Sequence, residues 1–471
     1  MSFFIRKGGT GGNKVAQAGK KRRAPQEGKG KGSKKFRDEE IDSEGSDIEA
    51  RDDVGYESEE DKETAEEKKL RLARLYLQEI QNELDEREKG GDEEEEKDED
   101  GVRRLEDGVK ERLREDVEAD RGKLRREVTS TLNFTEVESA HLQDKNHKLS
   151  ITSLVLSKTG DHLYTASKDK GLVKWSLPSG RKEFKVPGGK KGEENKTQGH
   201  CNTITSLAVT SDNVYLASGD TSKNIYIWTC DNMIRSHIFK GHRGEISGLA
   251  FRTGTHTLYS SSHDRSVKIW SVDEKCYIET LFGHQDHVLG IDAGSRERAI
   301  TVGGRDRTVR VWKIVEESQL VFNAPGSSVD LVKLLNEEHW VTAGEDGHLA
   351  VWGAMRKKPL AMVERCHGTD PVNGEPNWVS SLSTLHNSDM VLTGSRDGFI
   401  RIWSIGEGFK TIIPVGTIQC PGFVNSLDVG EGGGRIVAGV GQEHRLGRWW
   451  RDSSVKNRIY LYTLKPVTSS S

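Results

Sequence analysis

The chain has 471 residues, of which 31% are charged and 33% hydrophobic, and its formal net charge is −4. It has no run of 18 apolar residues and no apolar stretch behind its first Met, so we expect neither a transmembrane helix nor a secretory signal. Residues 1–142 carry 30 basic and 40 acidic side chains, which leaves 41 basic and 35 acidic for residues 143–471. Residues 143–471, which carry the excess of basic side chains, favour a polyanionic partner, and the acidic residues 1–142 do not.

The composition also bears on enzymatic and metal chemistry. The five cysteines are scattered and form no CxxC pair, so we interpret them as free thiols of a reducing compartment. A phosphate-binding loop, an HExxH motif and a nucleophile elbow are all missing. The sequence therefore predicts a protein that is not an enzyme, with no cofactor, no metal, no membrane partner and no small-molecule substrate.

Residues 1–62 read as a disordered leader that is first basic and then acidic. The basic cluster Lys20, Lys21, Arg22 and Arg23 predicts a nuclear or nucleolar localisation signal. The alternative is a solvated tail with general affinity for nucleic acid. In the acidic part, serines stand close before acidic residues, which is the context of an acidophilic kinase. The candidates for phosphorylation are Ser43, Ser46 and Ser58. The alternative for this part is a plain disordered spacer.

Residues 63–128 contain two helical patterns. Ala73, Leu77, Ile80 and Leu84 form a narrow apolar stripe within residues 63–88, and a second pattern covers residues 102–128. Either the two helices pack on each other, or the first docks into the groove of a partner. We favour docking of the 63–88 helix onto a larger assembly.

A repeat of about 40 residues dominates residues 134–466, and residues 467–471 form a short tail. Its clearest copy runs from Gly241 to Trp270: a Gly-His pair opens it, Asp264 follows His242 by 22 positions, and Trp270 follows Asp264 by six. Repeats with this period and this spacing of Gly-His, Asp and Trp are typical of WD-repeat blades. The sequence thus predicts an all-β protein, a seven-bladed WD40 β-propeller preceded by a disordered, partly helical N-terminal extension.

The recurring His, Asp and Trp residues are interpreted as structural, because a buried polar chain is tolerated only when all its members are paired. This predicted blade network comprises His147, Asp169, Trp175, His200, Trp228, His242, Asp264, Trp270, His284, Asp306, Trp312, Asp346, Trp352, Asp397 and Trp403. Four positions depart from the pattern. Blade two has Ser222 in the Asp position with Asp220 two residues early, blade four has Val302 in place of Ser or Thr, and Ala324 and Glu375 occupy the His positions of blades five and six.

The seventh blade is irregular, and two alignments compete for its third strand. Trp449 is one candidate for the core aromatic residue, with Glu443 in the Asp position. We prefer residues 457–462, because they copy the alternation of residues 224–228, and residues 441–456 then form an inserted loop. The chain ends before a fourth strand, so residues near 134–142 are expected to supply it and remove an open sheet edge.

The turns that carry the aspartates lie on one rim of such a propeller, and cations flank most of them, with Glu345 opposing. Three insertions emerge on this rim, at residues 187–198, 364–375 and 441–456. Arg, Lys and exposed Trp suit RNA, because cations bind phosphates and indoles stack on bases. The predicted RNA-binding residues are Lys168, Lys170, Lys190, Lys191, Arg265, Arg305, Arg307, Arg396, His444, Arg445, Arg448 and Trp449. The alternatives are that these cations keep the surface soluble or that they bind an acidic peptide.

Several stretches are more specific than a generic blade, above all GTHTLYSSSHDRSVKIW (254–270), GGRDRTVRVWKI (303–314) and VAGVGQEHRLGRWWR (437–451). On these and on the helix EEKKLRLARLYLQEI (66–80), the chain resembles the family of WD-repeat proteins associated with the U3 small nucleolar RNA, the fifty-five-kilodalton-type component of that particle. The resemblance runs from the helix through the propeller, and the leader is similar in character only.

The resemblance implies a non-catalytic, nucleolar subunit that binds the box B/C element of U3 small nucleolar RNA. It implies box C/D core proteins as partners, including the kink-turn-binding protein, and small-subunit processome proteins reached through the 63–88 helix. The particle would support pre-rRNA cleavage for 18S rRNA. The rival interpretation is a generic WD40 adaptor, either a ubiquitin-ligase substrate receptor or a chromatin reader. The Trp-Asp-x-Arg motif of many substrate receptors is absent, and a basic rim disfavours a basic histone tail.

Overall fold

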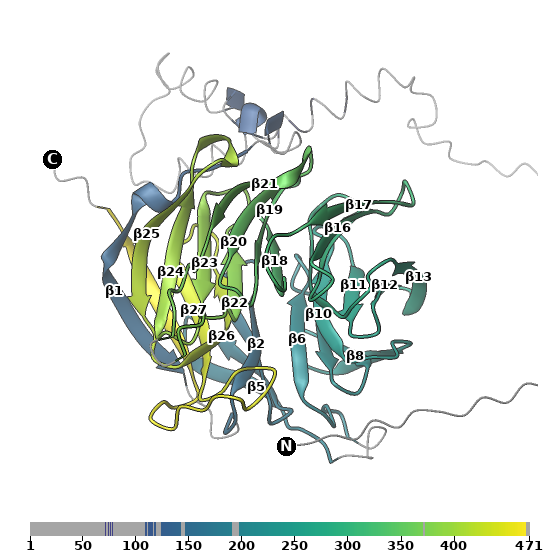
Figure 1. The fold of residues 1–471 in the computed structure, drawn as a ribbon. Coiled ribbons are helices and arrows are strands. Elements are labelled where there is room, and N and C mark those ends of the chain that lie inside the picture. Colours follow the sequence, from purple (N-terminus) through teal and green to yellow (C-terminus); the bar gives the residue numbers. More distant parts are fainter. Residues whose placement is uncertain are drawn as a thin grey trace, which may run out of the picture. The chain divides into compact units, whose positions relative to one another are not determined.

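The structure is a computed structural model that describes residues 124–142, 147–190, 197–370 and 373–467, together with some residues of 71–78 and 109–118. The predicted targeting cluster, the three candidate phosphorylation sites and Lys191 lie outside the described residues. Within residues 71–78 and 109–118 the described residues are helical. The remainder is a β-propeller of seven four-stranded antiparallel sheets, which confirms the predicted fold (Figure 1).

Each of the first six blades is a meander of four consecutive strands, numbered from the inside outwards. Blade one has β2 (Ile151–Leu156), β3 (His162–Ser167), β4 (Leu172–Ser176) and β5 (Arg181–Val186). Blade two has β6 (Ile204–Val209), β7 (Tyr215–Asp220), β8 (Asn224–Thr229) and β9 (Arg235–Lys240). Blade three has β10 (Ile246–Phe251), β11 (Thr257–Ser262), β12 (Ser266–Ser271) and β13 (Cys276–Phe282).

The next three blades follow the same order. Blade four has β14 (Val288–Ala293), β15 (Arg298–Gly303), β16 (Thr308–Lys313) and β17 (Ser318–Asn323). Blade five has β18 (Leu331–Leu334), β19 (His339–Ala343), β20 (Leu349–Gly353) and β21 (Arg356–Val363). Blade six has β22 (Ser381–Thr384), β23 (Met390–Gly394), β24 (Phe399–Ile405), the short 3-10 helix η3 (Glu407–Phe409) and β25 (Ile412–Gln419).

Blade seven joins the two ends of the propeller. Its inner strands are β26 (Phe423–Val429), β27 (Arg435–Gly441) and β28 (Arg458–Pro466), and its outer strand is β1 (Leu132–Leu142), which pairs antiparallel with β28. The outer strand therefore comes from the start of the propeller sequence, as predicted, and no edge of β28 is left open. Tyr462 of β28 is 2% exposed in the core, whereas Trp449 is 63% exposed, so the structure has the second of the two alignments considered for this blade.

The innermost strands of all seven blades surround a central channel. Small residues on these strands allow the close approach, and the cavity they line has a volume of about 140 Å³. Apolar residues of neighbouring blades pack between the sheets and form the core. A propeller of this topology has two rims. We call the one that carries the connections between second and third strands the Asp-turn rim, and the other the opposite rim.

A strap at residues 124–131, which includes the 3-10 helix η2 (Thr129–Thr131), lies on the opposite rim of blades five and six. Asp389 holds it, accepting hydrogen bonds from the backbone N–H groups of Val128 (2.8 Å) and Thr129 (3.2 Å). Arg125 donates from Nε to the carbonyl of Ile405 at 2.7 Å. The strap is thus held on the rim away from the aspartate turns.

Candidate nucleic-acid interface

The Asp-turn rim is built on a buried polar chain, seen most completely in blade three. His242 contacts Asp264 through Nδ1 at 2.9 Å and Ser260 through Nε2 at 2.7 Å, and Trp270 donates its indole N–H to Ser260 at 2.8 Å. Burial alone raises the pKa of Asp264, but hydrogen bonds from His242, Ser266 and the backbone of Arg243 hold that pKa well below its usual range. An ionised, fully bonded carboxylate fixes the turn in one conformation.

The other blades use the same chain with local changes. In blade two the early Asp220 contacts His200 at 3.1 Å, and Ser218 joins His200 to Trp228. In blade one the oxygens of Ser167 and Thr165 lie 2.9 and 3.1 Å from His147, while Asp169 accepts from the N–H of Leu149. In blade five, which has Ala324 in place of histidine, Ser327 bonds Asp346 and Trp352 donates to Thr342 at 2.8 Å.

Two of the predicted departures are wrong. Blade four does contain the Ser or Thr hydroxyl that joins the blade histidine to the blade tryptophan. Thr301 accepts from Trp312 and contacts His284, both at 2.8 Å. The sequence pattern missed it because one extra residue separates the hydroxyl from the aspartate.

Blade six does contain the histidine. His367, and not Glu375, contacts Asp397 and Thr393, both at 2.9 Å, and Trp403 donates to Thr393 at 2.9 Å. The sequence pattern missed His367 because the insertion lies after this histidine and lengthens its separation from Asp397.

The turn residues after the aspartates adopt a left-handed backbone conformation. In blades five and six this residue is glycine, namely Gly347 and Gly398, with φ of 69° and 82°. In blades one, three and four it is Lys170, Arg265 and Arg307, with φ of 67°, 68° and 55°. A side chain in this conformation costs about 1 kcal/mol or more that glycine avoids. In blade two, Lys223 holds the equivalent position with φ of 74°, so four blades keep a cation on the rim at a conformational cost.

The loop between β27 and β28 is held against the rim by Glu443, which is 4% exposed. Its carboxylate accepts from Lys168 Nζ and Arg448 Nε, both at 2.9 Å. Burial raises the pKa of Glu443, but Lys168 and Arg448 together bring it below its usual value. Lys168 also donates to the carbonyl of His444 at 2.7 Å. Lys168, predicted as an RNA contact, thus anchors the loop through a side chain that is only 12% exposed.

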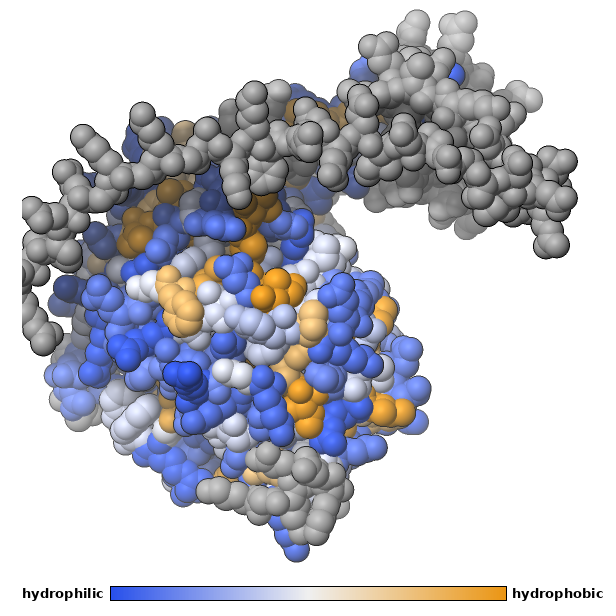
Figure 2. All heavy atoms as spheres, turned by 90° about the vertical axis from the view of Figure 1, so that its right-hand side faces the viewer, coloured by the Kyte–Doolittle hydropathy of each residue, from blue (hydrophilic) through white to orange (hydrophobic). Residues whose placement is uncertain are grey.

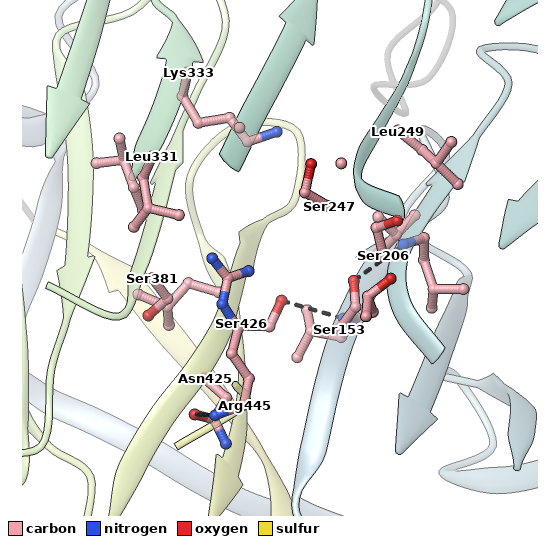
Figure 3. Close-up of a pocket in the computed structure, with 18 of the residues that line it drawn as sticks. Ser153, Ser206, Ser247, Leu249, Leu331, Lys333, Ser381, Asn425, Ser426 and Arg445 are labelled. Carbon is pink, nitrogen blue, oxygen red and sulfur yellow. Dashed lines mark hydrogen bonds between the residues drawn. The ribbon is translucent and has the colours of Figure 1, made fainter. Parts of the chain in front are cut away.

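His444 and Arg445 were predicted on the exposed rim, and the structure places both side chains inside. His444 is 3% exposed and stacks on Trp378 with ring centroids 4.2 Å apart. Burial, Arg445 and Lys168 lower the pKa of His444 to about 3, so the ring is neutral. Arg445 extends from the loop into the central channel, towards the inner strands of blades six and seven (Figure 3). The channel supplies room for this side chain that no sequence pattern reveals.

The outer part of the loop stays exposed beside a groove of about 750 Å³ between the insertions of blades six and seven. Arg448 and Trp449 have exposed side chains, 64% and 63% respectively. Trp450 lies under the guanidinium of Arg396, whose central carbon is 4.1 Å from the ring centroid. Arg396 also pairs with Asp370, so its charge is largely compensated. The groove is lined by Trp449 and the exposed Arg451, and Arg448, which pairs with Glu443, lies close by in the same loop, so this part of the rim presents an indole and two guanidinium groups.

The remaining predicted contact residues divide by exposure. Exposed side chains belong to Lys190, Arg265, Arg305 and Arg307. Lys170 is half-buried and lies 3.5 Å from the carbonyl of Gly189. Sequence reasoning missed Trp378, which donates to Asp330 at 2.7 Å beneath the loop. It also missed Trp450 as a partner of Arg396. A tryptophan outside the blade pattern was the available signal for Trp378.

Within the described parts of the chain, no group of three or more His, Cys, Asp or Glu side chains is arranged to hold a metal ion. The five cysteines are free, and all except Cys276 are buried. No helix among the described residues is long and apolar enough to cross a bilayer. The Asp-turn rim presents cations together with the exposed indoles of Trp449 and Trp450.

Known proteins share this architecture. The model of the WD domain, G-beta repeat, matches residues 140–176, 192–229, 234–271, 275–313 and 365–404. The U3 small nucleolar RNA-interacting protein 2 of Mus musculus is 47% identical over 410 residues, which cover 87% of this chain and 84% of that protein. The protein of the same name from Homo sapiens is 46% identical over 407 residues, which cover 86% and 83%. A solved structure of U3-55K is 48% identical, with a TM-score of 0.66, and covers 69% of this chain and 98% of that one.

Proposed function

Because the chain belongs to the WD-repeat family of U3 small nucleolar RNA-interacting proteins, we propose that it is a non-catalytic, RNA-binding component of the U3 small nucleolar ribonucleoprotein. Its place of action is then the nucleolus. The ligand is the box B/C region of U3 RNA, bound together with box C/D core proteins such as the kink-turn-binding protein. The outcome is pre-rRNA cleavage for 18S rRNA and small-subunit assembly. The 63–88 helix is proposed to bind small-subunit processome proteins.

The observation that carries this proposal is the exposed pair Arg448 and Trp449, fixed on a rim that also presents Arg265, Arg305 and Arg307. Glu443 and Lys168 hold the base of the loop, so the pair is presented by a supported segment. An exposed indole stacks on an unpaired base, and arginine neutralises phosphate. Cations that occupy left-handed turn positions support a role for these side chains beyond solubility.

The proposal is tested by ultraviolet crosslinking of the full-length protein in cells, followed by sequencing of the bound RNA. We expect U3 RNA, with crosslinks concentrated at residues 446–451. Recovery of messenger RNA, or of no RNA, would instead support a WD40 adaptor. With the purified protein, neutralisation of six to ten phosphates should weaken binding by roughly 10³–10⁵ between 50 and 200 mM salt. An affinity that does not change with salt would contradict an RNA-binding rim.

A further inference from the structure

A second groove lies on the opposite rim, between blades four and five, with a volume of about 210 Å³. Its apolar lining includes Leu320, Leu334, Trp340 and Met355. Met355, in the turn between β20 and β21, is 94% exposed. A large apolar side chain so fully in water at the edge of an apolar groove is typical of a docking site.

The groove also contains an unsatisfied donor. Trp340 is 1% exposed, and its indole N–H has no acceptor among the described residues. In contrast, the blade tryptophan Trp352 donates its N–H to Thr342 at 2.8 Å. Buried polar groups are almost always paired, and this N–H is itself closed to solvent, so a ligand acceptor reaches it only when the side chains that line the groove move apart.

The acidic and basic side chains beside the groove differ in whether they already have partners. Its carboxylates are already engaged, because Glu337 accepts from Ser295 at 2.7 Å and Glu338 pairs with Arg296 at 2.8 Å. Directly after Met355, the outer strand β21 begins with three exposed cations, residues 356–358, which make no ion pair with any residue that the structure describes. Among the described residues, this edge therefore carries three cations without an ion pair against one carboxylate, Glu337, that is hydrogen-bonded but not ion-paired.

We propose that this groove binds an acidic segment of a partner protein, which inserts one apolar side chain between Leu320 and Met355. A backbone carbonyl of the segment accepts from Trp340, and its carboxylates pair with residues 356–358. A protein segment fits better than RNA, because the lining between Leu320 and Met355 is apolar and suits an aliphatic side chain, which a polypeptide has and RNA lacks. The Asp-turn rim stays free, so this partner and the RNA occupy the propeller together.

The chain's own acidic extension is the competing occupant. Its strap passes near the groove, since Asn336, the neighbour of Glu337, donates to the carbonyl of Leu124 at 3.4 Å. The test must therefore distinguish a partner protein from residues 1–123 of the same chain.

The experiment places a photo-crosslinking amino acid at Met355 in the full chain, purified within its native particle, and identifies the crosslinked peptides by mass spectrometry. The matched control position is Phe282 of β13, which is 73% exposed. Figure 2 faces the side of the propeller on which β13 lies, and it shows apolar residues scattered among polar ones. We expect Met355 to crosslink to one acidic segment of another protein and Phe282 not to do so. Crosslinks to residues 1–123, to RNA, or equally at both positions would overturn the proposal.

Variants then test the chemistry of the groove. Met355→Glu together with Lys357→Glu should reduce recovery of the crosslinking partner at least tenfold, with U3 RNA recovery unchanged. Trp340→Phe keeps the ring and removes the donor, and should reduce recovery severalfold. Both variants should keep the unfolding midpoint within a few degrees. Undiminished recovery of the partner with the double variant would overturn the proposal, and simultaneous loss of RNA would show that the two rims are not independent.

Discussion

Blades three and seven show two ways to build one sheet of the same propeller. Blade three joins its strands by a tight turn, and His242, Ser260, Asp264 and Trp270 satisfy one another in its interior. Blade seven lacks this chain. Tyr462 fills the aromatic position and donates its hydroxyl to the carbonyl of Gln419 at 3.0 Å, so no aspartate turn is needed.

The difference shows where the chain has freedom to carry function. A polar chain that must be completely paired dictates the length of the turn beside it, because any shift leaves a buried group unsatisfied. Blade seven is free of this constraint and carries a long loop in the same place. The loop has its own support in Glu443, Lys168 and Trp378, and it presents Arg448 and Trp449 outwards.

The largest expected effect comes from comparing alanine substitutions of two tryptophans, one inside a blade and one in the loop of blade seven. Trp270→Ala should lower the free energy of unfolding by about 3–5 kcal/mol, because it removes a buried ring and the indole N–H that Ser260 accepts. Trp449→Ala should change it by less than about 0.5 kcal/mol, since that ring is exposed. Denaturant unfolding of both variants measures the difference. Similar losses would mean that Trp449 also belongs to the core.

A smaller effect is expected at the base of the loop. Glu443→Gln should cost about 3 kcal/mol, because Lys168 loses a buried partner at 2.9 Å. Hydrogen exchange should show faster opening of residues 442–457 and little change in blade three. The matched control is Glu345→Gln, at an exposed position of the same rim, which should leave both readouts unchanged. Protection of the loop that survives in Glu443→Gln would contradict the anchoring role.

The next effect depends on pH. His444 has a pKa of about 3 in the folded chain and an ordinary, higher pKa when unfolded, so the unfolded state binds more protons between these values. The free energy of unfolding should therefore fall as the pH drops below about 6.5, by up to roughly 1.4 kcal/mol per pH unit from this residue. His444→Phe keeps a ring against Trp378 and should remove this part of the acid sensitivity. Identical pH profiles for the two proteins would show that the histidine does not titrate in this way.

The smallest effect should appear in the aspartate turns. The backbone at Arg265 has φ of 68°, a conformation that glycine adopts without steric cost. Arg265→Gly should therefore stabilise the fold by up to about 1 kcal/mol, and it should weaken RNA binding. Lys275→Gly, at φ of 54° in a turn of the opposite rim, should have a similar effect on stability and none on RNA binding. Loss of stability in Arg265→Gly would mean that the side chain supports the turn itself.

The regular blades could be predicted because their chemistry is local and periodic. The spacing of His242, Asp264 and Trp270 is set by the width of one sheet, and the same spacing recurs along the chain. The prediction failed at His367, where an insertion changes the spacing but not the contact. It failed at His444 and Arg445 for a different reason. Their burial depends on Trp378, Asp330 and the central channel, which only the closed ring brings together.

The most direct test of an RNA-binding rim is the affinity of the purified full-length protein for the box B/C region of U3 RNA. We would compare the double variant Arg448→Ala, Trp449→Ala with Lys357→Ala, Met355→Ala, which removes one cation and one large apolar side chain from the opposite rim. Loss of one stacked base and one phosphate contact should weaken binding by about 1–3 kcal/mol, or roughly 5–150-fold, in the first variant only. Equal affinities for the two variants, with unfolding unchanged in both, would contradict the account.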